Sequence, residues 1–253
     1  MRTRYLSLDA LVLRSREQNE ADAWVTLLAP VAGLVSGIAK NGLKSQKRFM
    51  GALGPATGAA VLMARRQGVW YLEEAQVERP YGGLKRDARA YALACYAIEQ
   101  ILATHPQGPQ AADAYPLLSE LFEHLEGGVA DLPLTRLAWD LRLMESLGLA
   151  PHLGDCVACG MELTGRQQVF HGPSGGLLCP THAAAQSNLV PVEAAAIALV
   201  EALMAGELPG RETAAGAGRR EARALADAHL RWHLSAELKS RRVLEQLSRR
   251  ARP

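Results

Sequence analysis

Three of the four cysteines in this chain lie within one short segment that also contains a histidine. The segment holds two pairs with the same inner spacing, Cys156-x2-Cys159 and Cys179-x2-His182, separated by nineteen residues. A tetrahedral Zn²⁺ ion takes four thiolate or imidazole donors, and two tight turns that each carry two ligands supply them. The spacing therefore predicts one bound Zn²⁺ ion that ties two distant turns of the chain together.

Two other interpretations of this segment stay open from the sequence. His171 is a second histidine between the pairs and would replace His182 as the fourth ligand, although it lies at a hairpin tip rather than on a turn with a cysteine. The other alternative is two buried cysteine pairs that bind no metal. Cys95, on an apolar helical face elsewhere in the chain, is interpreted as a core residue.

The predicted zinc ion is structural rather than catalytic. A catalytic zinc keeps one position open for water, whereas four protein ligands close the coordination shell. The zinc-deaminase pattern and His-Glu-x-x-His are absent, as are the Walker A, G-x-G-x-x-G and G-x-S-x-G sequences. The sequence therefore predicts that this protein is not an enzyme.

The first eighty residues have the pattern of short β-strands. Apolar runs end at Pro30, are bounded by Gly33 and Gly42, and meet at Gln67-Gly68, a strong hairpin signal. About five strands in this length fit a small closed barrel of the OB-fold type better than a sandwich.

After this region the apolar period becomes helical. Asp113 is the expected N-cap of one of the helices. The predicted helical segments are residues 86–105, 113–128, 133–148, 191–206 and a long C-terminal stretch at 221–250. We therefore predict an α+β protein, with a five-stranded OB-fold β-barrel at 1–80 and an α-helical domain at 81–253 that carries a zinc-binding loop at about 151–190.

Charge is distributed unevenly along the chain, although the net charge is only +2. Residues 1–79 carry 11 Lys/Arg against 7 Asp/Glu, and residues 219–253 carry 10 against 4. The middle, residues 80–218, carries 7 against 15. Two basic ends suit a polyanionic partner, although solvated basic helix faces give the same pattern.

A basic segment in the predicted barrel is the second informative motif. "AKNGLKSQKRFMGALGP" at 39–55 combines cations with one aromatic residue and has almost no acidic residues. Cations of this kind bind phosphates, and aromatic rings stack on bases. Trp24, Trp70 and Tyr71 are further candidates for stacking, although a core role is the commoner one for each alone. The predicted DNA-binding residues are Lys40, Lys44, Lys47, Arg48, Phe49, Arg65 and Arg66.

Three motifs carry a resemblance to a known family. "AKNGLKSQKRFMGALGP" resembles the strand-and-loop motif of RecO, a bacterial family of recombination mediators, and "GLAPHLGDCVACG…GGLLCPTH" resembles its zinc region. "HLSAELKSRRVLEQL" is similar to its C-terminal helix, so the likeness spans the chain in order. One departure is His182, where members that keep the zinc site commonly have a fourth cysteine.

The resemblance implies a function in DNA repair and recombination. RecO proteins bind single- and double-stranded DNA, anneal complementary strands without ATP, and act with RecR to load RecA onto DNA coated with single-strand-binding protein. They also bind the acidic C-terminal tail of that binding protein. By charge, the residues expected to meet this tail are Arg219, Arg220, Arg223, Lys239, Arg241 and Arg242.

The sequence also predicts where the protein is located, and it leaves two other functions open. No run approaches the roughly 18 apolar residues that span a bilayer, so we expect a cytoplasmic protein, associated with the nucleoid, with no membrane partner. The alternatives are a protein-interaction adaptor that never touches DNA and an RNA-binding OB-fold protein, each with a structural zinc.

Overall fold

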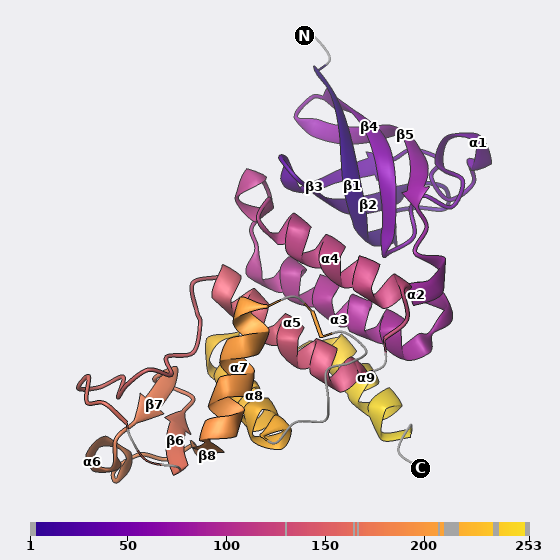
Figure 1. Ribbon diagram of the computed structural model, residues 1–253. Helices are drawn as coiled ribbons and strands as arrows, with labels where there is room; N and C mark the ends of the chain where they lie inside the picture. The colour runs from indigo at the N-terminus through magenta and orange to yellow at the C-terminus, as the bar shows by residue number, and fades with distance from the viewer. Residues whose placement is uncertain are drawn as a thin grey trace. The chain divides into compact units, whose positions relative to one another are not determined.

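The computed structural model of the chain forms two compact units (Figure 1). One unit lies within residues 1–128 and 238–253, and the other lies within 129–237. This division differs from the predicted domains, because helices that follow the barrel in sequence belong to the same unit as the barrel. The residues described are 4–129, 131–163, 165, 167–206, 208–209, 218–234 and 238–250.

The first unit begins with a closed five-stranded barrel in the order β1-β2-β3-β5-β4, which confirms the predicted fold class. The barrel closes where β3 pairs in parallel with β5, at Ile38↔Tyr71 and Ala39↔Leu72. Gly37 makes this approach possible, because a Cβ there would lie 2.9 Å from the carbonyl oxygen of Trp70. The strands are β1 (Arg4–Glu17), β2 (Ala23–Ala29), β3 (Gly33–Ala39), β4 (Thr57–Arg66) and β5 (Val69–Arg79).

The turn between β4 and β5 confirms the hairpin predicted at Gln67-Gly68. Both residues have positive φ, at 49° and 86°. Two successive positive φ values are what a type I′ turn requires, and its twist matches that of the flanking strands. The short turn therefore places Arg65 and Arg66 at the tip of the barrel.

Strand β1 is curved and pairs with two different strands of the barrel. Its first part pairs with β4, from Arg4↔Arg65 onward, and its last part pairs with β2. The register shifts between Val12 and Arg14, and such irregularities bend a strand and increase its twist. Alternate residues of the strands fill the barrel with aliphatic side chains, among them Val25, Leu27, Val61, Met63 and Leu72.

Helices complete the first unit. Asp87 accepts the N–H groups of Arg89 and Ala90 and so caps α3. Asp113 is the N-cap residue of α4, as predicted, but its side chain makes no capping hydrogen bond. These helices are α1 (Gln46–Phe49), α2 (Gly82–Arg86), α3 (Ala88–Thr104), η1 (Pro109–Ala111), α4 (Ala114–Glu126) and α9 (Lys239–Arg250).

The second unit combines helices with a small sheet in the order β7-β6-β8. Residues 189–193 form strand β8, although the sequence predicted a helix from 191. Pro191 pairs with Val169 of β6, as an edge strand allows, so the helix begins only at Ala194. The elements are α5 (Leu132–Ser146), β6 (Gln167–His171), β7 (Gly176–Leu178), α6 (Pro180–Ala183), β8 (Leu189–Glu193), α7 (Ala194–Ala205) and α8 (Arg219–His233).

The predicted C-terminal helix at 221–250 is two helices, one in each unit. Helix α8 ends at His233 in the second unit, and α9 begins at Lys239 in the first. The first N–H groups of α9, from Lys239 and Ser240, donate to the carboxylate of Glu99 on α3. A carboxylate distant in sequence therefore accepts hydrogen bonds from the first N–H groups of α9, which have no partner within the helix. No local pattern reveals this contact. Within the described parts of the chain, no helix is long and apolar enough to cross a membrane.

Candidate metal centre and candidate nucleic-acid interface

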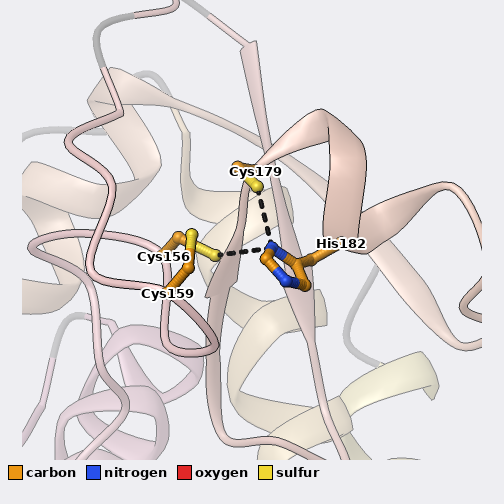
Figure 2. A group of neighbouring side chains, drawn as sticks. All are labelled: Cys156, Cys159, Cys179 and His182. Atoms are coloured by element: carbon orange, nitrogen blue, oxygen red, sulfur yellow. Dashed lines mark hydrogen bonds between the residues drawn. The ribbon is translucent and has the colours of Figure 1, made fainter.

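The four predicted metal ligands come together in the second unit (Figure 2). The first pair lies on a tight turn, in which the N–H groups of Cys159 and Gly160 donate to the carbonyl of Cys156. Gly160 has φ +69°, a conformation that favours glycine. The second pair lies where β7 meets α6, with Cys179 at the N-cap of α6. One turn of helix then brings His182 alongside Cys179.

The distances within this cluster suit one metal ion. The Nδ1 atom of His182 lies 3.1 Å from the Sγ atom of Cys179 and 3.8 Å from that of Cys156. All four ligand atoms, including Cys159 Sγ, lie within 4.8 Å of one another. Zn–S and Zn–N bonds of about 2.3 and 2.0 Å place tetrahedral donors roughly 3.5–3.8 Å apart. The three thiols and one imidazole therefore fit a zinc ion in both chemistry and spacing.

Hydrogen bonds lower the pKa of two of the cysteine thiols, Cys156 and Cys179. Burial alone raises the pKa of the Cys156 thiol, but backbone N–H groups of Cys179, Ala158 and Cys159 outweigh it and lower the pKa to about 6. The backbone N–H and then the side chain of His182 lower the pKa of Cys179. Thiolates are the form that binds metal, so the site favours the species a metal needs.

His171 does not belong to the metal cluster. Its side chain is buried, and its Nδ1 atom lies 2.8 Å from the hydroxyl of Ser174 in the same hairpin. His182 is therefore the histidine that the fold brings to the cysteines, as the spacing of the pairs predicted. The sheet anchors both turns, because the N–H of Val157 donates to the carbonyl of Leu177 on β7.

The basic segment between β3 and β4, defined here as residues 40–48, leaves part of its charge unpaired. Lys40 forms an ion pair of 2.6 Å with Asp22, which also accepts the N–H of Asn41. Lys44 and Lys47 are exposed, and no carboxylate among the described residues lies within ion-pair distance of either. Asp22 was not predicted as part of this site, because Lys40 follows it by eighteen residues and no local pattern links the two.

Arg48, the last residue of this segment, and the next residue, Phe49, have structural roles. The guanidinium of Arg48 donates to the carbonyl of Lys40 and lies 4.9 Å from the ring centroid of Phe49. Phe49 is 2% exposed and belongs to the barrel core, so its face is not available to a base. This burial corrects the prediction that Phe49 stacks on DNA.

The two arginines at the β4–β5 tip differ in their partners. Arg66 pairs with Glu73 at 2.8 Å and lies over the ring of Tyr71. Arg65 lies 5.8 Å from the ring centroid of Trp70 and donates to the carbonyl of Gly68. Arg66 is therefore partly neutralised by a carboxylate, and Arg65 is held by an aromatic ring and a carbonyl.

Several of the C-terminal cations bind carboxylates of their own unit. Arg219 pairs with Asp131, and Arg223 pairs with Asp140 and Asp227. Arg241 pairs with Glu245 on α9 at 3.0 Å. The structure thus gives Arg219, Arg223 and Arg241 internal ion-pair roles that charge counting did not anticipate. Arg220, Lys239 and Arg242 have exposed side chains.

The fold and these sites define a class of protein: an OB-fold barrel with a cationic segment, followed by a unit with a Cys₃His metal-type cluster. Residues 1–81 match the family described as "Recombination protein O N terminal", and residues 85–242 match "Recombination protein O C terminal". The DNA repair protein RecO of Geobacter metallireducens is 33% identical over 239 residues, which cover 94% of this chain and 96% of that protein. The DNA repair protein RecO of Anaeromyxobacter sp. (strain Fw109-5) is 35% identical over 250 residues, 97% of each chain. This chain belongs to the RecO family of DNA repair proteins.

Proposed function

We propose that this protein binds single- and double-stranded DNA through its barrel and anneals complementary strands without ATP. The observation that carries the proposal is the pair Lys44 and Lys47, exposed and without a carboxylate partner among the described residues. The ion pair between Lys40 and Asp22 fixes the start of this segment on the barrel. Two cations that need no internal partner are available for phosphates.

The chemistry of annealing suits such a surface. Two complementary strands repel each other, so a protein that brings them together must neutralise phosphates and leave the base edges free. Lysine and arginine do so by displacing counterions, which makes binding steeply dependent on salt. Phosphate contacts carry no sequence information, so we expect annealing to be largely independent of sequence.

Membership of the RecO family supports a proposal for the partners. We propose that the protein acts with RecR, binds the acidic C-terminal tail of single-strand DNA-binding protein, and helps load RecA in the cytoplasm at the nucleoid. Three exposed cations, Arg220, Lys239 and Arg242, are the proposed contacts for the acidic tail. The protein is proposed to act as a mediator with no catalytic site of its own.

We also propose that the Cys₃His cluster holds one structural Zn²⁺ ion. When bound, zinc would cross-link the turn at Cys156 to the start of α6, with no position left for a reacting water. The expected result is one zinc per chain after purification without chelator, lost in Cys179→Ser and retained in His171→Ala and in His182→Cys. Zinc that persisted in Cys179→Ser would contradict this ligand set.

Annealing of two labelled complementary oligonucleotides across a salt series tests the main proposal. Fast annealing at low salt, without nucleotide and slowed by added salt, is the expected result. If DNA neither bound nor annealed at low salt, the protein would instead be a protein-interaction adaptor. Stronger binding of RNA than of DNA of equal length would favour an RNA-binding role.

A further inference from the structure

The barrel has a large hollow at the end where β1 and β5 begin. Its volume is about 930 Å³, and its walls are mainly apolar. Leu6, Leu8 and Val35 are among its apolar lining residues, and Trp24 and Trp70 are its two aromatic ones. The hollow exists because β3 pairs with β5 only at Ile38↔Tyr71 and Ala39↔Leu72, so the earlier part of β3 leaves β5 and the barrel wall opens.

Two arginines share a row with one of these indoles. In the barrel register Arg4 pairs with Arg65, and Arg65 pairs with Trp70, so the three side chains lie on one face across β1, β4 and β5. The guanidinium of Arg65 lies 5.8 Å from the ring centroid of Trp70. No carboxylate among the described residues lies within ion-pair distance of Arg4 or Arg65. Arg4 and Trp70 therefore line the hollow, and Arg65 lies between them in the strand register.

A second aromatic row leads away from the hollow toward the basic segment. Trp24 pairs with Ile38, which pairs with Tyr71, so these side chains cross β2, β3 and β5 on the outside of the barrel. Trp24 is 38% exposed, whereas its neighbours Ala23 and Val25 are fully buried. Lys40 follows Ile38 by two residues and comes directly after the end of β3. The second row thus places two more aromatic rings between the hollow and Lys40.

We propose that this hollow takes unpaired bases of single-stranded DNA, which stack on Trp70 and Trp24 while their phosphates meet Arg4 and Arg65. The inference rests on the proposed DNA-binding function and deepens it by assigning a separate contact for bases. Aromatic rings with interleaved cations are the general means of holding single strands without sequence preference. Bases paired inside a duplex cannot enter the hollow, so this contact gives single strands an advantage over duplexes.

The polar groups of the hollow favour a base over an acidic peptide. Asp9 is a lining carboxylate five residues along β1 from Arg4, roughly 16 Å away. A carboxylate there accepts hydrogen bonds from base amines and repels the side chains of an acidic peptide. Ser36 and Gln107, which are hydrogen-bonded to each other, also line the hollow and offer uncharged partners for base edges. A nucleotide uses both the cation at Arg4 and these polar partners for base edges.

Two substitutions at exposed positions test the inference without disturbing the core. Trp24→Ala removes an exposed indole, and Val31→Glu adds a carboxylate at a lining residue that is 84% exposed. Trp70 is left intact, because it packs against the barrel core. The matched controls are Trp232→Ala, an indole 49% exposed in the other unit, and Val77→Glu on β5, which does not line the hollow.

The measurement is anisotropy of an oligo(dT) strand, an abasic strand of equal length and charge, and a duplex. Each test variant should weaken oligo(dT) binding at least about fivefold, and Trp24→Ala should leave binding of the abasic strand and the duplex unchanged. The control variants should match the parent protein. Intrinsic tryptophan fluorescence should be quenched by oligo(dT) and less so by the abasic strand.

Three outcomes overturn the inference, and they separate it from the proposed function. If both test variants bound oligo(dT) like the parent while Lys44→Glu/Lys47→Glu lost all three DNAs, the hollow would not bind bases and the DNA function would stand. If the parent bound no DNA, both proposals would fail together. If Val31→Glu lost binding of an acidic peptide but not of oligo(dT), the hollow would be a peptide site.

Discussion

The two basic ends of this chain look alike in sequence and differ in structure. The segment at 40–48 keeps Lys44 and Lys47 exposed, with no carboxylate partner among the described residues. In α8, by contrast, Arg219 and Arg223 bind Asp131 and Asp140. The carboxyl group of Asp140 is fully buried, so its ion pair is part of the packing between α5 and α8. The number of cations in a segment therefore does not reveal how many are available to a partner.

The difference lies in where the acidic residues fall in space. Residues 219–253 contain few acidic residues of their own, but the acidic middle of the chain supplies Asp131 and Asp140 to α8. The barrel contributes one such residue to the basic segment, Asp22, and it pairs with Lys40 alone among the lysines there. A basic patch is free for phosphates only where the fold brings no carboxylate to it.

The largest effect should follow from breaking the buried pair in the second unit. Replacing Arg223 by Ala leaves the Asp140 carboxylate buried without its closest cation, which costs about 3 kcal/mol in the free energy of unfolding. Urea unfolding followed by fluorescence measures the change, and Arg220→Ala should change stability by no more than about 0.5 kcal/mol. Equal stability of the two variants would show that Arg223 is not structural.

Reversing charge on the basic segment should act on DNA binding and not on folding. Lys44→Glu/Lys47→Glu should weaken single-strand binding at least about tenfold and lower the salt slope by about 1.4, which corresponds to two lost phosphate contacts. Arg220→Glu/Arg231→Glu changes the net charge equally on α8 and is the matched control. Similar losses in the two variants would mean that total charge, rather than the segment, determines binding.

A smaller effect should follow from replacing Asp22, the carboxylate that pairs with Lys40 at the start of the basic segment. Hydrogen bonds from Lys40, from the N–H of Asn41 and from Asn19 lower the pKa of Asp22 to about 2. Because this pKa lies below the unfolded value of about 3.9, the stabilisation is present above pH 4 and is lost as the pH falls toward 2. Asp22→Asn should therefore be less stable than the parent at pH 6, with the difference shrinking below pH 4.

Unfolding of both proteins as a function of pH measures this linkage. Asp22→Asn also releases Lys40 from its ion pair, so single-strand binding at pH 7 should be equal or slightly stronger. A difference in stability that stayed constant from pH 6 to pH 2 would contradict the role assigned to the carboxylate.

Local patterns predicted the parts of this fold that depend on local contacts. The hairpin at Gln67-Gly68 was correct, because a turn with two positive φ values needs particular residues wherever it occurs. The grouping of the three cysteines with His182 was predicted for the same reason, since each pair lies on one short turn. The choice of His182 over His171 also followed from its place on a turn with Cys179.

Contacts between distant segments were not predictable. Nothing near Phe49 indicates that the barrel core buries it, and nothing near Arg223 indicates that Asp140 lies opposite. The C-terminal helix was predicted as one element because its helical period continues, whereas Glu99 receives the start of a separate helix. Each of these errors concerns a residue whose partner lies far away in sequence.

Hydrogen exchange with and without a single-stranded oligonucleotide tests the central claim most directly. We expect slower exchange of backbone amides in peptides that cover residues 40–50 and 65–72, with α8 unchanged. The lining of the hollow near Trp24 should also be protected. Protection confined to residues 219–233, with the barrel peptides unchanged, would contradict the claim that the barrel is the DNA-binding surface.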